Sequence, residues 1–162
     1  MILPKQKLLS LAIVSDHLGD SQFQPAGVDV TLKKAFSFSS NGQIDFDNTE
    51  RRISDVQELP FEGEWVQLAP GSYKVQFNEY VKIPCDSAAI CLPRSSLLRS
   101  GATLECALWD PGYDGRSEAL LVVSNPHGIR FKRGAKIGQM VFVRLSEAAS
   151  ELYEGAYKGE NK

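Results

Sequence analysis

Short apolar segments separated by turn residues make up most of the chain. Val, Ile, Phe and Tyr predominate within the segments, and Pro-Gly, Asn-Gly and Asn-Pro-His-Gly sequences divide them at intervals of roughly ten residues. This pattern is typical of an all-β sandwich or barrel, because a parallel sheet would need helices that the pattern lacks. The strands that it predicts are Val28–Leu32, Glu64–Leu68, Ser72–Val75, Ala88–Leu92, Ala119–Val123, Gly128–Phe131 and Gln139–Arg144.

Helix is expected only as a minor component. The apolar residues Leu8–Val14 predict one short helix, which Pro4 and Gly19 confine. Helical periodicity barely recurs until Glu147–Tyr153. The tail Tyr153–Lys162 is polar and contains glycine, so its composition favours a frayed terminus, although it carries two tyrosines.

The segment Ser37–Pro60 is polar and acidic and is expected to leave the sheet, with a hairpin turn at Asn41-Gly42. The length of 162 residues and the hydrophobic fraction of 43% fit a single domain over residues 1–162. The net charge of -2 and the pI of about 5.7 provide no global basic field for polymeric nucleic acid or a membrane surface. Any anionic partner should therefore be small.

The cysteines and the N-terminus indicate a reducing compartment. Cys85, Cys91 and Cys106 are odd in number and lack CxxC spacing, which argues against a disulfide framework and a zinc site and favours buried thiols. His17 and His127 have no ligand spacing, so no metal site made of protein ligands is predicted. Because a signal-peptide pattern and a long apolar stretch are both absent, we expect a soluble cytoplasmic protein.

The segment that follows the predicted strand Ala88–Leu92 suits a phosphate chain. Arg94, Ser95, Ser96 and Arg99 offer guanidinium and hydroxyl groups within six residues. If Ser95 and Ser96 leave the strand, their N–H groups become free to face an anion. The alternative is a solvated basic turn that caps the strand.

Two further segments carry polar groups in apolar surroundings. Asp110 follows the apolar run that ends at Trp109 and precedes Pro-Gly, so its carboxylate lies where a strand breaks into a turn, beside Tyr113. An acid beside a tyrosine suits a sugar, although a purely turn-forming Asp is the alternative. The basic segment from Arg133 ends at Gln139, which is expected to be partly buried on a strand face, where its amide needs partners.

Together with Pro25–Val30, these three segments resemble, in order and spacing, the four internal motifs of the superfamily that joins trimeric dUTP pyrophosphatases to dCTP deaminases. The resemblance runs from about Pro25 to Leu145 and is closest to the short archaeal type of dUTPase. It implies a jelly-roll-like β-barrel, a homotrimer with active sites between neighbouring chains, and Mg²⁺ held mainly by the substrate triphosphate. It also implies that backbone groups in the hairpin Gly101–Leu108 read uracil.

The resemblance assigns roles to individual residues. It implies that Ser95 contacts the phosphate that becomes the leaving group and that Arg99 neutralises the phosphate chain. Asp110 would hold the 3'-hydroxyl and orient the attacking water, and Tyr113 would stack on the deoxyribose, where a 2'-hydroxyl would collide with the ring. Gln139 would lie near the substrate or the subunit contact.

The choice between hydrolase and deaminase depends on one position. Deaminases of this superfamily carry a proton-shuttling glutamate at the place of Leu120, and Glu118 would be displaced by about 7 Å along the strand. Hydrolysis of dUTP to dUMP and pyrophosphate is therefore the favoured function. A dCTP deaminase, alone or bifunctional, and a non-catalytic nucleotide-binding regulator are the alternatives, although intact Asp110 and Arg99 weigh against the regulator.

The superfamily uses its C-terminal segment as a flap that orders over bound nucleotide. Residues 150–162 would form that flap here, but they lack the Gly-rich fifth motif, with its Arg and Phe, of ordinary trimeric dUTPases. Tyr153 and Lys158 are the tail residues expected to contact the substrate.

Overall fold

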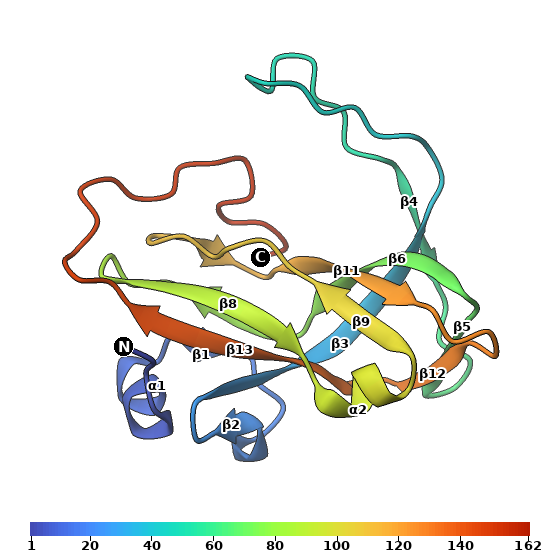
Figure 1. Cartoon of the computed structure of the whole chain (residues 1–162), viewed down its shortest axis with the longest axis horizontal. Helices are drawn as coiled ribbons and strands as arrows, with labels where there is room; N and C mark the ends of the chain where they lie inside the picture. Colours follow the sequence, from blue (N-terminus) through green and yellow to red (C-terminus); the bar gives the residue numbers. More distant parts are fainter.

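The structure, a computed structural model, describes every residue from Met1 to Lys162. Its helices are α1 (Lys5–Leu11), α2 (Ser95–Arg99) and the 3-10 turn η1 (Asp20–Gln22). Strands form most of the remainder, which confirms the predicted all-β fold with few short helices (Figure 1). The strands are β1 (Val14–Ser15), β2 (Phe23–Gln24), β3 (Gly27–Phe38), β4 (Val56–Leu59), β5 (Trp65–Leu68), β6 (Gly71–Phe77), β7 (Tyr80–Lys82), β8 (Ser87–Pro93), β9 (Ala102–Glu105), β10 (Asp114–Gly115), β11 (Glu118–Val123), β12 (Ile129–Lys132) and β13 (Lys136–Arg144).

One antiparallel sheet with the strand order β8-β13-β3-β6-β11-β9 forms the body of the molecule. The long strand β3 pairs with β13 through Val28–Thr31 and with β6 through Leu32–Ser37. The end strands approach each other, because Ala89 in β8 and Trp109 after β9 exchange two backbone hydrogen bonds of 3.0 Å. The sheet is therefore curved into an almost closed, jelly-roll-like barrel (Figure 1).

Side chains alternate between the interior of the barrel and its outer surface. In β11, for example, Ala119, Leu121 and Val123 are buried, whereas Leu120 faces outward. This period of two is what a half-buried strand requires. The inward side chains of the barrel strands join in one continuous hydrophobic core. Each of the seven predicted strands falls on an observed strand.

The first helix lies earlier than predicted. It covers Lys5–Leu11 instead of Leu8–Val14, because Ala12 adopts a left-handed conformation and Val14 pairs with Val81 in β7. The residues Glu147–Tyr153 form no helix, and this part of the chain instead follows the barrel surface.

The polar excursion is an arm formed by residues 39–55, which projects from the end of β3 and returns into β4 (Figure 1). The predicted turn at Asn41-Gly42 is wrong, since the bridge between Gln43 and Arg52 continues the hairpin beyond it. The chain reverses nearer the tip, where the Asp45 carboxylate accepts the Glu50 N–H at 2.6 Å. Local hydrogen bonding by Asp therefore outweighed the Asn-Gly signal.

The three cysteines occupy different environments, although all were expected to be buried. Cys91 is buried in β8 and Cys106 is half-buried after β9, but Cys85 is exposed in the turn before β8. Burial of Cys85 is thus corrected, because turns between barrel strands lie on the surface. No helix is long and apolar enough to span a membrane.

We predict that Gly27→Ala destabilises the barrel. A Cβ atom at Gly27 would lie 2.4 Å from the backbone oxygen of Met140 in β13, and backbone atoms cannot move aside without disturbing the ladder. Overpacking of this kind costs about 1–3 kcal/mol in free energy of unfolding, measured by urea titration. Gly19→Ala is the matched control, because nothing lies within 4 Å of its added Cβ. Equal stability of the two variants would contradict the prediction.

Candidate active site

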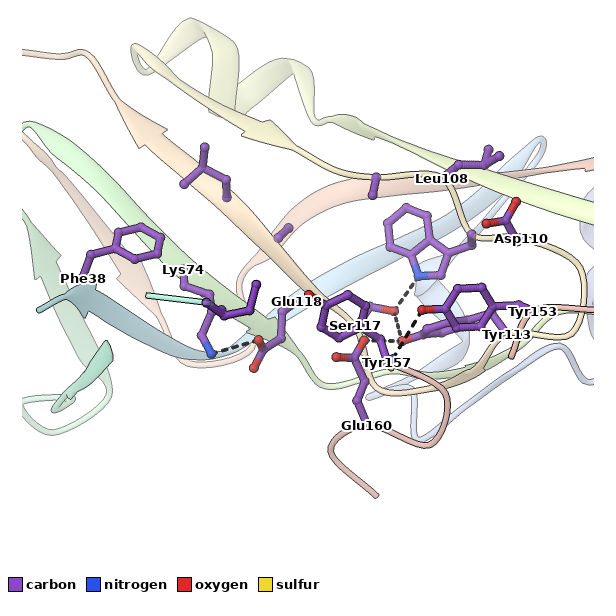
Figure 2. Close-up of a pocket in the computed structure, with 15 residues that line it drawn as sticks. Phe38, Lys74, Leu108, Asp110, Tyr113, Ser117, Glu118, Tyr153, Tyr157 and Glu160 are labelled. Carbon is purple, nitrogen blue, oxygen red and sulfur yellow. Dashed lines mark hydrogen bonds and ion pairs between the residues drawn. The ribbon is translucent and has the colours of Figure 1, made fainter. Parts of the chain in front are cut away.

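A cavity of about 490 Å³ opens beside the loop that follows β9 (Figure 2). Loop residues from Ala107 to Asp110 and strand β11 line one part of it, and the C-terminal tail lines another. Phe38 and Ile53, at the base of the arm, close a further side. Most lining side chains are apolar, with a few polar groups among them, which is the usual make-up of a site for a small organic ligand.

A chain of hydrogen bonds fixes two aromatic residues of this cavity, Trp109 and Tyr113 (Figure 2). The indole N–H of Trp109 donates to Ser117 Oγ at 2.6 Å, and Ser117 Oγ lies 3.0 Å from the Tyr113 hydroxyl. That hydroxyl donates to Glu160 Oε1 at 2.7 Å. Burial raises the pKa of Tyr113, so its phenol stays protonated and can remain a donor.

Asp110 both closes a turn and lines the cavity. Its backbone oxygen accepts the Tyr113 N–H at 3.1 Å and so closes the turn, in which Gly112 has a φ of 85°. Its side chain lines the cavity, and its carboxylate accepts no hydrogen bond from the chain. Both carboxylate oxygens therefore remain available to a ligand or to water.

The C-terminal tail is bound along the loop and is not frayed. The Tyr153 N–H donates to the Pro111 oxygen at 2.8 Å, and the Gly159 N–H donates to the Asp114 oxygen at 2.6 Å. The Arg116 N–H donates in turn to the tail oxygen of Glu160 at 3.0 Å. The tail thereby forms a wall of the cavity within its own chain.

The two tail residues predicted to contact the substrate lie in different places. Tyr153 lines the cavity, and its ring centroid is 6.0 Å from that of Tyr113. Lys158 lies outside this cavity, where its ammonium pairs with Glu154 at 2.5 Å. Tyr157 and Glu160, which also line the cavity, were missed by the sequence reasoning. The presence of two tyrosines in an otherwise polar tail was the one available signal.

The predicted phosphate-binding residues lie at the other end of β9. Ser95 and Ser96 leave β8 as expected, but they form the first turn of α2, so their N–H groups have no acceptor within the helix. Both serines and Arg99 are exposed, and Arg99 pairs with no carboxylate of the chain. These groups are free to contact an anion.

A buried carboxylate organises the basic residues beside α2. Asp29 is 2% exposed, and its Oδ2 atom lies 3.0 Å from Gln24 Nε2, 3.2 Å from Lys136 Nζ and 3.7 Å from Arg94 Nη1. The sequence signal for this role was an acid in an otherwise apolar strand. Gln139 pairs with Asp29 in the register of β13 and β3 and is half-buried, as predicted. Its side-chain amide forms no hydrogen bond within the chain.

A single chain does not bring the cavity residues Asp110 and Tyr113 together with the predicted phosphate-binding residues of α2. Trp109 pairs with Ala89, whereas α2 follows Pro93, four residues further along β8. This separation amounts to about 13 Å along the strand. Asp110 and Tyr113 therefore lie at one end, and Ser95 and the other α2 residues lie at the opposite end.

Leu120, which stands where the resemblance would put the deaminase glutamate, lines the cavity. Its cross-strand neighbours are Lys74 in β6 and Glu105 in β9. Glu118 also lines the cavity, but its carboxylate is paired with the Lys74 ammonium at 2.9 Å. The exposed Glu105 accepts a hydrogen bond from Thr103 at 3.3 Å. Neither acid takes the place of Leu120.

The sequence matches the family model described as dCTP deaminase-like over residues 2–145, so the chain belongs to that family. A relative from Methanosarcina acetivorans, named a probable deoxyuridine 5'-triphosphate nucleotidohydrolase, is 50% identical over 88% of this chain and 84% of its own length. A relative of the same name from Aeropyrum pernix is 40% identical over 99% of both chains. The deoxyuridine 5'-triphosphate nucleotidohydrolase of Methanocaldococcus jannaschii is 42% identical over 89% of this chain and 92% of its own.

Among solved structures, the fold is similar to a 2'-deoxycytidine 5'-triphosphate deaminase from Agrobacterium tumefaciens. The TM-score is 0.66 at 22% sequence identity, and the match covers 87% of this chain. It covers 47% of the deaminase chain, so this protein spans about half the length of that structure. The similarity supports the barrel fold independently of the strand pattern.

We predict that Glu160→Gln makes the stability of the protein depend less on pH. Burial raises the pKa of Glu160 above 4.5, with a further increase from Glu118, whereas Tyr113 and Lys74 act in the opposite direction. The stability that this group contributes is therefore complete below pH 4.5 and is lost as the pH rises through the higher pKa of the folded state. Gln keeps an oxygen acceptor for Tyr113 without the charge.

The free energy of unfolding of the variant should accordingly increase relative to wild type as the pH rises from 4.5 and then level off. Urea titrations at a series of pH values measure this difference. A difference that stays constant with pH would contradict the assigned environment of Glu160.

Proposed function

We propose that this protein hydrolyses dUTP to dUMP and pyrophosphate, which would remove dUTP from the nucleotide pool and supply dUMP. The observation that carries the proposal is a nucleoside-sized cavity in which the Asp110 carboxylate is free and Leu120 occupies the place of a proton-shuttling acid. The names of relatives at 40–50% identity, which cover most of the chain, support it.

The reaction would proceed by attack of water on the α-phosphorus. Asp110 holds the water, accepts a proton from it and orients its oxygen in line with the bond to the β-phosphate. That bond breaks, and pyrophosphate leaves with the bonding electron pair. Ser95 contacts the departing phosphate, while Arg99 offsets charge on the chain. Arg94 and Ser96 provide further contacts to the phosphates.

The nucleoside would lie in the cavity, with the deoxyribose against Tyr113. The Tyr113 hydroxyl is held by Ser117 and Glu160, so its ring cannot easily turn aside to admit a 2'-hydroxyl. Backbone groups in the hairpin Gly101–Leu108 would read uracil, and Tyr153 would border the sugar. This arrangement favours deoxyribose by steric exclusion.

Mg²⁺ would be held mainly through the substrate. The chain contains no group of three His, Cys, Asp or Glu side chains able to hold an ion, and the Asp29 carboxylate is already engaged by basic residues. Asp110 is the one cavity carboxylate free of protein partners, so it fits an outer contact to hydrated metal. When bound, the ion offsets negative charge on the triphosphate.

A homotrimer with shared active sites would unite the separated groups. The exposed Ser95 and Arg99 of one copy would complete the cavity that holds Asp110 of another, with Gln139 near the substrate or the contact between copies. Tail residues 150–162 would close the site, with Lys158 near the phosphates. We place this assembly of single-domain chains in the cytoplasm.

The assay that tests this function measures pyrophosphate and ammonia released from dUTP and from dCTP. We expect pyrophosphate from dUTP and no ammonia from dCTP, because Leu cannot transfer a proton. Asp110→Asn should bind a non-hydrolysable dUTP analogue but lose more than about tenfold in turnover, roughly 1.4 kcal/mol of barrier. Ammonia from dCTP would instead support a deaminase that uses Glu118 or Glu105. Binding of dUTP without turnover would support a regulator.

Two inactive variants should restore activity when they are assembled together. Asp110→Asn and Arg99→Ala each remove one half of the shared site, and random assembly from an equal mixture leaves roughly one quarter of the sites intact. Co-refolded chains should therefore regain about a quarter of wild-type dUTP hydrolysis, whereas each variant refolded alone should not. Absence of recovery in mixed oligomers would place both residues in a site within one chain.

A further inference from the structure

The arm of residues 39–55 presents apolar side chains that are largely exposed to solvent. Phe46 is fully exposed, and Ile44 and Ile53 are 77% and 60% exposed. The arm is held by few backbone contacts, among them the bridge between Gln43 and Arg52. Because an isolated two-stranded hairpin is marginally stable in water, such an arm gains from a partner that covers its apolar residues.

Ile44 and Ile53 share one face of the arm, and the fully exposed Phe46 lies in the bend near its tip. Gln43 pairs with Arg52, so Ile44 lies opposite Arg51, and Ile53 lies on the same face by alternation. Ile53 lines the cavity, and the Arg51 guanidinium lies 5.8 Å from the centre of the Tyr157 ring in the tail. The apolar face of the arm therefore begins at the cavity and extends outward beyond it.

The surface beside α2 is complementary to the arm in both apolar exposure and charge. Leu92 at the end of β8 and Leu98 in α2 are 55% and 52% exposed, and they flank exposed Ser95 and Arg99. The segment 93–100 carries two arginines and no acid, whereas the arm carries four acidic and two basic residues. Opposite charge around apolar contacts favours association and fixes its orientation.

We propose that the exposed apolar side chains of the arm bind the α2 surface of a second copy of this chain. Ile44, Phe46 and Ile53 of one copy cover Leu92 and Leu98 of the next, and the acidic tip of the arm lies near its arginines. This contact delivers the second copy's α2 to the mouth of the cavity, where Lys74, the basic residue that lines the cavity within a single chain, is already paired with Glu118. The proposal rests on the proposed function for the shared site, but the contact itself is a physical association that can be measured without catalysis.

The first test measures molar mass by light scattering during dilution. The double variant Ile44→Ser, Phe46→Ser should dissociate at a concentration at least about tenfold higher than wild type, because large apolar anchors dominate such interfaces. Leu9→Ser is the matched control, since Leu9 is exposed to 47% on α1, away from the arm. The proposal is overturned if the arm variant dissociates like the control, or if the wild-type protein is monomeric throughout.

The second test maps the contact directly. A photo-crosslinking benzoylphenylalanine at position 46, in a mixture of isotopically light and heavy chains, should join the arm of one chain to residues 90–99 of another. Crosslinks confined to one chain, or to a different surface of the second copy, would overturn the proposal. Because neither test uses turnover, a protein that fails to hydrolyse dUTP but passes both tests would disprove the proposed function and leave the arm contact intact.

Discussion

The curvature of β3 is the constraint on which the rest of the structure depends. This strand pairs with β13 in its first half and with β6 in its second. Each pairing accommodates one additional residue, Ile137 in β13 and Lys33 in β3. Such irregularities bend a strand and increase its twist. The bend lets β8 and β9 meet through Ala89 and Trp109, so it also fixes α2 at one end of the barrel and Asp110 at the other.

A buried carboxylate stabilises this bend. Glu79 is fully buried, and its oxygens accept the Thr31 N–H at 2.9 Å, the Thr31 hydroxyl at 2.6 Å and the Gln22 amide at 2.7 Å. The irregular pairing of β3 leaves the Thr31 N–H without a regular ladder partner, and a buried donor without an acceptor is costly. Glu79 supplies that acceptor, and three hydrogen bonds compensate for the burial of its charge.

The barrel separates two regions of the candidate site that differ in chemical character. The cavity near Asp110 is largely apolar and suits a nucleoside, whereas the region beside α2 concentrates basic groups that suit phosphates. The buried Asp29 carboxylate offsets part of that positive charge and contacts both Arg94 and Lys136. It thereby reduces the electrostatic repulsion between these two side chains while no anion is bound. In the proposed function a triphosphate would need both surfaces at once, so the separation within one chain would give the proposed association between copies a functional purpose.

The sequence by itself determined the features that depend on local chemistry. Alternating apolar residues located the seven strands, Pro and Gly located the turn after Asp110, and motif spacing placed Leu120 in the cavity. The tertiary structure decided what depends on partners distant in the chain. Val14 became a strand because Val81 was available to pair with it, and the tail became ordered because Glu160 could reach the Tyr113 hydroxyl. Such pairings lie tens of residues apart in the sequence, and only the packed barrel brings their atoms within hydrogen-bonding distance.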